Sequence, residues 1–194
     1  MRFMISSVIG TLGASAALVA FFLHTPKTTE VQPIVVEPYI PSTWECPDCN
    51  PAEQYVLEQL QEKTRITDRN ALATILGNIK SESNFHANIC EGGARVSYLD
   101  CHRGGYGLVQ WTTESRYMGL GLFCKKYGCD PSSLEGQTSY MINENQFQKV
   151  LPGFEGGGQT VSQYMVPSYR WLGWGIKGRR ETYAYDYTKR MVLV

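Results

Sequence analysis

The sequence has no excess of charge of either sign, because its 18 Lys and Arg residues balance its 18 Asp and Glu residues. It also lacks the basic stripe interleaved with aromatic side chains that nucleic-acid-binding proteins typically carry. No internal repeat is visible, and the 43% of hydrophobic residues are sufficient for one globular core. We therefore expect no nucleic-acid partner, and one folded domain with appended segments.

Histidine is scarce, which argues against a metal centre. The three histidines, His24, His86 and His102, are scattered and lack the spacing of metal ligands. The six cysteines fall as three close pairs, which favours local disulfides in an oxidising compartment over zinc. Their connectivity cannot be deduced from the sequence, and the CPDC pair could also hold reduced or redox-active thiols. We expect no metal and no cofactor. The pairs are Cys46 and Cys49, Cys90 and Cys101, and Cys124 and Cys129.

The N-terminal residues lack charge over a length that can cross a membrane. No charged residue lies between Phe3 and Leu23, and a transmembrane helix needs about 20 predominantly apolar residues. A cleaved signal peptide is the alternative, with the small residues 14–16 (ASA) as its cleavage site. The apolar run continues past that site, which favours an uncleaved anchor. We predict a transmembrane or signal-anchor helix over residues 1–24, and a protein that acts outside the cytoplasm.

A proline-rich stretch follows this helix. Residues 25–51 hold six of the nine prolines, which is typical of an extended, semi-rigid spacer without a core of its own. The spacer separates the N-terminal segment from a folded domain that we predict over residues 52–194.

Apolar residues beyond the spacer recur at helical spacing, so we predict a predominantly α fold. A first helix begins with Asn50 as its cap and Pro51 in its first turn, and Thr67 or Asp68 caps a second. A Gly-rich loop or small hairpin over residues 86–107 follows. A helix is predicted over residues 113–127, and another begins after a cap at Asp130, with Pro131 as its first helical residue. Two more are predicted near residues 158–166, with a break at Pro167, and from about residue 179.

The stretch ILGNIKSESNF, residues 75–85, places a carboxylate on the apolar face of the second helix. Ile75, Ile79 and Glu82 are four and three residues apart and stack along one side. Glu82 has two interpretations. It is a boundary residue, whose carboxylate reaches solvent or a helix-end contact, or it is a half-buried acid. In the second case desolvation raises its pKa, which suits a general acid near neutral pH.

A second stretch, GGYGLVQWT at residues 104–112, contains groups suited to a sugar. Its glycines allow close approach of the backbone to a ligand. Tyr106, Gln110 and Trp111 combine apolar surfaces with hydrogen-bonding tips. The alternative is a Gly-rich turn before a helix, with Trp111 in the core.

Together the segments GNIKSESNF, GGYGLVQWT and FCKKYGCDPSSLEGQTSYMINE resemble the phage tail lysozyme family over roughly residues 52–190. In that family a helix ending in Glu-Ser precedes a GLxQW segment, a further helix and a Gln-bearing helix. A similar pairing occurs in goose-type lysozymes and lytic transglycosylases. The resemblance implies a lysozyme-like helical domain that acts on peptidoglycan.

The resemblance also implies roles for individual residues. Glu82 would be the catalytic acid that protonates the glycosidic oxygen between N-acetylmuramic acid and N-acetylglucosamine. Tyr106, Gln110 and Trp111 would line the sugar cleft, and Ser83 would support the helix terminus or the substrate. Arg116, Arg179 and Arg180 fall at positions that the resemblance marks as structural or muropeptide-binding.

The second carboxylate that glycosidases commonly use has to come from the loop. Candidates are Glu91 and Asp100, whereas Glu114 begins the next helix. Asp100 lies one residue away from an aspartate position of goose-type lysozymes, and Thr112 replaces a second such aspartate. We predict Asp100 as the partner, with a plain surface charge as the alternative. If no carboxylate faces Glu82, the N-acetyl group of the substrate would complete the reaction and give an anhydro product.

The expected function is that of a phage-type muramidase for penetration or lysis of the host cell wall. A membrane-tethered endolysin at the host inner membrane or periplasm fits the N-terminal helix, and so does a virion protein with tail-protein partners. A lytic transglycosylase is one alternative. A non-catalytic, wall-binding virion protein with a lysozyme-like fold is the other.

Overall fold

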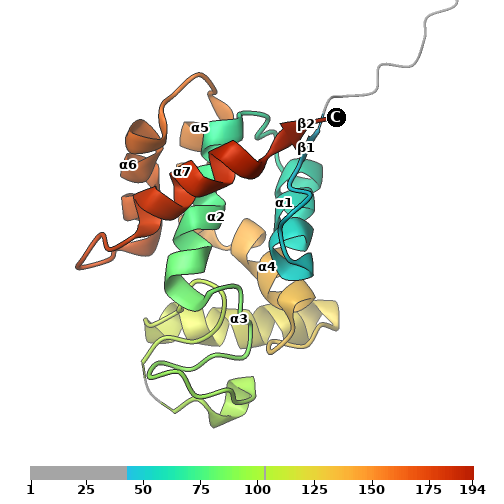
Figure 1. The fold of residues 1–194 in the computed structure, drawn as a ribbon. Helices are drawn as coiled ribbons and strands as arrows, with labels where there is room; N and C mark the ends of the chain where they lie inside the picture. Colours follow the sequence, from blue (N-terminus) through green and yellow to red (C-terminus); the bar gives the residue numbers. More distant parts are fainter. Residues whose placement is uncertain (1–42, 103) are drawn as a thin grey trace, which may run out of the picture. The chain divides into compact units, whose positions relative to one another are not determined.

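The computed structural model describes residues 43–102 and 104–194, which form a helical domain (Figure 1). The predominantly α class is therefore confirmed, and it fits a lysozyme-like fold. The predicted helix over residues 1–24 and most of the spacer lie outside the described residues. Within the described part, no helix is long and apolar enough to cross a membrane. The elements are β1 (Trp44–Glu45), α1 (Pro51–Lys63), α2 (Arg69–Ser83), the 3-10 helix η1 (Tyr98–Asp100), α3 (Glu114–Tyr127), α4 (Leu134–Asn143), α5 (Asn145–Glu155), α6 (Val161–Leu172), α7 (Arg180–Arg190) and β2 (Val192–Leu193).

Side-chain caps fix the starts of the first two helices. Asn50 accepts hydrogen bonds from the backbone N–H groups of α1, and Glu53 accepts one from the N–H of Asn50, which completes a capping box. At α2 the Asp68 side chain accepts from the N–H groups of Asn70 and Ala71, so Asp68, and not Thr67, is the cap. Helix α2 ends at Asn84, whose left-handed backbone (φ 51°) turns the chain away from the helix axis.

Helix α2 is the central element of the domain. Every residue from Ala71 to Ile79 is buried, and α7 crosses it closely (Figure 1). The crossing depends on Gly77, because a Cβ atom there would lie 2.5 Å from the backbone nitrogen of Ala184. A glycine in the middle of α2 therefore determines how near α7 can lie.

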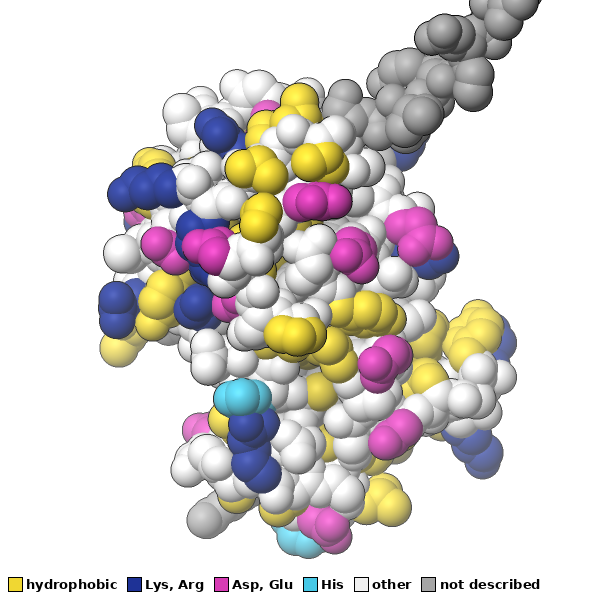
Figure 2. Space-filling model, turned by 45° about the vertical axis from the view of Figure 1, so that its right-hand side comes forward, with side chains coloured by type: hydrophobic (Ala, Val, Ile, Leu, Met, Phe, Trp, Pro, Cys, Tyr) yellow, Lys and Arg dark blue, Asp and Glu magenta, His cyan; other side chains and the backbone are white. Residues whose placement is uncertain are grey.

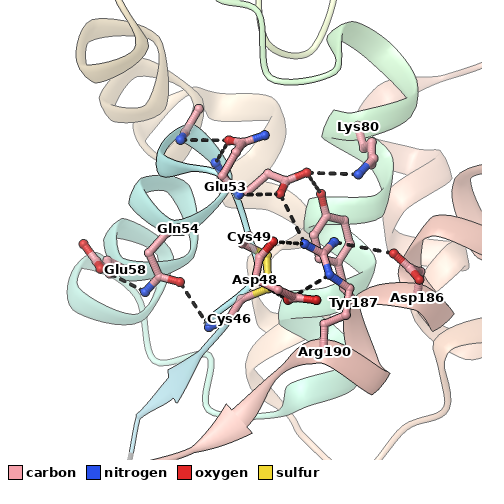
Figure 3. Close-up of a disulfide and its surroundings, with 12 residues drawn as sticks. Cys46, Asp48, Cys49, Glu53, Gln54, Glu58, Lys80, Asp186, Tyr187 and Arg190 are labelled. Carbon is pink, nitrogen blue, oxygen red and sulfur yellow. Dashed lines mark hydrogen bonds and ion pairs between the residues drawn. A yellow bond between two sulfur atoms is a disulfide. The ribbon is translucent and has the colours of Figure 1, made fainter.

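The C-terminal end of α7 is anchored beside the disulfide of Cys46 and Cys49 (Figure 3). The Nε of Arg190 donates to Asp48 at 3.0 Å, and the Tyr187 hydroxyl donates to the buried Glu53 at 2.6 Å. These contacts join α7 to α1 and to the residues that precede α1.

Residues 43–50, which the proline content assigns to the spacer, are folded onto the domain. Strand β1 pairs antiparallel with β2, with Trp44 opposite Leu193 and Glu45 opposite Val192. The folded region therefore begins earlier than the sequence indicates.

The described residues of the Gly-rich segment between α2 and α3 form isolated bridges and no regular hairpin. The disulfide between Cys90 and Cys101 closes it, and Tyr98 stacks on Tyr117 of α3 with ring centroids 4.4 Å apart. Burial raises the pKa of Tyr117 to about 12, and its hydroxyl donates a hydrogen bond to the Tyr98 carbonyl. These contacts hold the loop against α3.

All three cysteine pairs form disulfides within their own segments, as the spacing predicts. The third joins Cys124 at the end of α3 to Cys129.

Two predicted helix boundaries are wrong. Helix α4 is capped by Ser133, because Asp130 instead forms a turn with the two serines that follow Pro131. Helix α6 continues through Pro167 to Leu172. The ring of Pro167 lies against Gly153 of α5, and this packing helps to offset the backbone hydrogen bond that a proline removes.

Candidate active site

Glu82 lies on the last turn of α2 and forms an ion pair with Arg180, the first residue of α7. The side chain of Glu82 is 15% exposed and that of Arg180 is 9% exposed. The sequence places isoleucines around this carboxylate, but its immediate partner is a buried guanidinium. A pair removed from water to this degree interacts more strongly than a surface ion pair.

Arg180 is itself held by several contacts. Its Nη1 donates to the carbonyls of Ile176 and Lys177 at 3.1 and 3.0 Å, and its guanidinium lies 4.8 Å from the ring centroid of Trp174. Its buried Nε has no hydrogen-bond partner in the described part of the chain. The close crossing at Gly77 brings this arginine to the end of α2.

Ser83 connects α2 to the Gly-rich segment. Its buried hydroxyl donates to the carbonyl of Leu108 at 2.8 Å. The two segments that the sequence singles out therefore meet next to Glu82, and Ser83 supports the helix terminus from inside the core.

Gln137 of α4 binds the backbone of the Gly-rich segment. Its buried side chain accepts from the Leu108 N–H at 2.8 Å and donates to the Ala87 carbonyl at 2.7 Å. Gly107 has a positive φ of 72°, and a Cβ there would collide with the Gln137 amide. Gln110, partly exposed, donates to the Gly107 carbonyl at 3.0 Å.

Tyr106 and Trp111 are in the core and have no exposed surface. The Tyr106 hydroxyl donates to the Val96 carbonyl at 3.2 Å, and the Trp111 indole donates to Glu144 at 3.2 Å. We therefore assign these two rings to the support of the Gly-rich segment and not to contact with a sugar.

A sequence profile of the phage tail lysozyme family matches residues 52–169, which is more than half of the chain. The chain belongs to this family. Membership suggests a lysozyme-like glycosidase role, and the family implies peptidoglycan as the substrate. No curated protein and no solved structure matches the chain. The matched segment contains Glu82 and the Gly-rich segment, whereas Arg180 lies beyond it. Membership of the phage tail lysozyme family and three disulfides are consistent with a virion or an extracytoplasmic location.

Besides Glu53, the lysozyme domain contains another buried carboxylate that the sequence does not reveal. Glu144, between α4 and α5, accepts two hydrogen bonds from Arg116 and one from each of the Trp111 and Trp171 indoles. All of its partners are structural groups from different elements, so Glu144 holds the lysozyme core together. Arg116 thereby has a structural partner.

The candidate second carboxylates are exposed, and two are engaged elsewhere in the loop. Asp100 accepts from the Ser97 hydroxyl at 2.6 Å, and Glu91 accepts from the Gly105 N–H at 2.9 Å. In Figure 1, η1, which contains Asp100, lies at the end of the loop that is remote from α2. Glu114 is exposed on the first turn of α3. In this arrangement Arg180, and none of these carboxylates, is the charged partner of Glu82.

One group of metal-ligand side chains stands out among the described residues. The donor atoms of Cys46, Asp48 and Cys49 lie within 4.8 Å of one another. The two sulfurs are bonded to each other, so neither offers the thiolate that a metal would need. Over the face that Figure 2 shows, basic and acidic side chains are interspersed, and some of them lie against each other.

Proposed function

We propose that the chain is a muramidase that cleaves the bond between N-acetylmuramic acid and N-acetylglucosamine, with Glu82 as the general acid. The observation that carries the proposal is the position of Glu82. It is a largely buried carboxylate at the end of α2, fixed next to the Gly-rich segment by the Ser83–Leu108 hydrogen bond and compensated by Arg180. Burial, a charged partner and a rigid helix are the features expected of a catalytic carboxyl group.

In the proposed reaction Glu82, the carboxylate of the ion pair with Arg180, first takes up a proton from solvent and then transfers it to the glycosidic oxygen. The C1–O bond breaks, its electron pair stays on the leaving oxygen, and positive charge develops at C1 of the muramic acid ring. Glu82 becomes a carboxylate in this step, and the guanidinium of Arg180 stabilises that charge in a site with little water. Water then adds to C1 and loses a proton to a partner group, which gives a new reducing end, and Glu82 takes up a proton from solvent.

The partner that activates this water is Asp100 in the first version of the proposal. For this the loop that carries η1 has to move toward Glu82 when substrate binds.

The second version is a transglycosylase reaction that needs no other carboxylate. The engagement of Asp100 and Glu91 within the loop favours it. The N-acetyl group of the substrate would stabilise C1, and the sugar's own 6-hydroxyl would add there, losing its proton to Glu82. The product is then an anhydro sugar.

Product analysis tests these versions against each other. The full-length chain is incubated with purified peptidoglycan, and the soluble products are identified by mass spectrometry. Reducing ends mean hydrolysis and anhydro ends mean transglycosylation. Pelleting with the wall without any release would instead support the non-catalytic wall-binding alternative.

A matched pair of variants tests the role of Glu82. Glu82→Gln should reduce product release by about 10²- to 10⁴-fold, which is the contribution of general acid catalysis. Glu58→Gln, which changes an exposed glutamate on α1, should leave release unchanged. Both are compared at a temperature at which circular dichroism shows them folded. Retained activity in Glu82→Gln would remove Glu82 from the acid role.

We further propose that the chain acts on the host wall from outside the cytoplasm, during penetration or lysis. The three disulfides support this, since they form in oxidising compartments.

A further inference from the structure

The segment GWGIKGR, residues 173–179, lies next to Glu82 and beyond the part of the chain that the family profile matches. Arg180 makes the connection. Its Nη2 contacts Glu82, its Nη1 contacts the backbone of Ile176, and its guanidinium lies against Trp174. Trp174 and the proposed acid therefore share one buried cation, which places an aromatic ring beside the reaction site.

Trp174 differs from the other three tryptophans in its hydrogen bonding. The Trp44 indole donates to the Thr67 carbonyl, and those of Trp111 and Trp171 donate to Glu144. No residue of the described part accepts a hydrogen bond from Trp174, and its side chain is partly exposed. Three indoles thus serve the fold, while the fourth offers a free donor.

The ring of Trp174 is also held in place. Tyr169 of α6 meets it edge-on, with centroids 5.3 Å apart and an interplanar angle of 76°. Tyr169 is itself 55% exposed, so it adds accessible aromatic surface on the same side. A ring fixed by a cation and a second ring loses little freedom on binding a ligand.

We propose that Trp174 is a sugar-stacking residue of the glycan site and binds an N-acetylhexosamine ring next to the bond that Glu82 cleaves. A pyranose ring has an apolar C–H face that packs on an indole, and hydroxyl and acetamide oxygens at its edge that accept from an indole N–H. This assigns to the C-terminal segment the role that the sequence gives to Tyr106 and Trp111. The inference rests on the proposed function, because it takes Glu82 as the point of cleavage.

The first test compares Trp174→Ala with Trp44→Ala, each in the full-length chain. Trp44 is a matched control: it is also partly exposed, and Arg69 lies 5.4 Å from its ring centroid, but it is located on β1. We expect Trp174→Ala to raise KM for soluble glycan strands about tenfold while kcat changes less than threefold. Trp44→Ala should leave both unchanged. Unchanged KM in Trp174→Ala would overturn the inference.

A second measurement does not depend on how the alanine variant folds. In the inactive Glu82→Gln chain, binding of a GlcNAc tetramer should shift the tryptophan emission, because Trp174 is at the site. Adding Trp174→Phe should abolish this shift, while titration calorimetry still shows binding within about fivefold. A shift that survives Trp174→Phe would place the sugar elsewhere.

The two proposals fail in different ways. If the wild-type chain cleaves peptidoglycan, Glu82→Gln does not, and both Trp174 tests are negative, only the stacking role is overturned. If the wild-type chain neither cleaves nor binds glycan, the proposed function is overturned as well.

Discussion

The crossing of α2 and α7 at Gly77 leads to a sharp prediction for Gly77→Ala. A Cβ atom at this position would lie 2.5 Å from the nitrogen of Ala184 and 2.8 Å from the carbonyl oxygen of Arg180. Ordinary contacts of a Cβ begin at 3.4 Å, so the two helices must separate by about 0.9 Å (3.4 − 2.5). Both neighbours are backbone atoms, which cannot rotate away as a side chain can.

Two opposing effects decide the stability of this variant. Alanine is favoured over glycine in a helix interior by about 1 kcal/mol. Overpacking of a tight contact costs about 1–3 kcal/mol, and more when backbone has to move. We therefore expect a net loss of up to about 2 kcal/mol. The separation also moves Arg180 relative to Glu82, and a displacement of about 1 Å at a reaction site can cost about 10²-fold in rate. Activity should fall on the order of 10- to 100-fold.

Gly153→Ala is the matched control. It also lies inside a helix, α5, but its Cβ would meet Pro167 at 3.4 Å, an ordinary contact. This variant should be neutral or up to about 1 kcal/mol more stable, with full activity. Urea denaturation followed by circular dichroism gives the stabilities, and release of soluble peptidoglycan fragments gives the rates. If Gly77→Ala is as stable and as active as Gly153→Ala, the close crossing does not position the site.

Two further predictions concern the buried carboxylates. Glu144→Gln leaves the Arg116 guanidinium without its counter-charge, so the free energy of unfolding in urea should fall by about 3 kcal/mol. Burial alone raises the pKa of Glu53, but hydrogen bonds from Tyr187, the Asn50 N–H and Lys80 outweigh it and hold this pKa below its ordinary value of 4.5. Glu53 therefore contributes stability above about pH 4.5 that is lost as the pH falls through its folded-state pKa. Stability of Glu53→Gln should depend less on pH in this acid range.

Glu58→Gln again serves as the control for both variants, because Glu58 is exposed. A Glu144 variant with the urea midpoint of the control would show that the four hydrogen bonds to this carboxylate add nothing to stability. Parallel acid denaturation curves for the wild type and Glu53→Gln would contradict the prediction for Glu53.

The sequence predicts those features that local chemistry decides. Asn50 is a residue type that caps helices, so the start of α1 follows from residue type and spacing, and for α2 the same reasoning narrows the cap to Thr67 or Asp68. The three disulfides likewise join cysteines that lie close to each other in the sequence. The split between α4 and α5 is not predictable in this way, since Glu144 leaves helical geometry where its carboxylate meets partners from α3 and α6.

The surroundings of the proposed acid show where sequence reasoning stops. Periodicity correctly indicates that the face of α2 with Ile75 and Ile79 is buried, but it does not indicate what covers that face. The cover is α7, which brings Arg180 to Glu82 from 98 residues away. The sequence does not separate buried from exposed tryptophans for the same reason. Trp111 and Trp174 are both flanked by glycine or polar residues, and only tertiary contacts place Trp111 in the core and Trp174 at the surface.

The pairing of β1 with β2 brings the two ends of the described domain next to each other. The backbone N–H of Thr43 donates to the carbonyl of Val194 at 3.0 Å, and the N–H of Val194 returns a hydrogen bond at 2.9 Å. A short peptide could therefore join these two residues, and the chain could be opened instead at the exposed turn around Gly156. Such a circular permutant would keep α2, α7 and their crossing unbroken, and it would free the lysozyme domain for insertion into another protein in a new order.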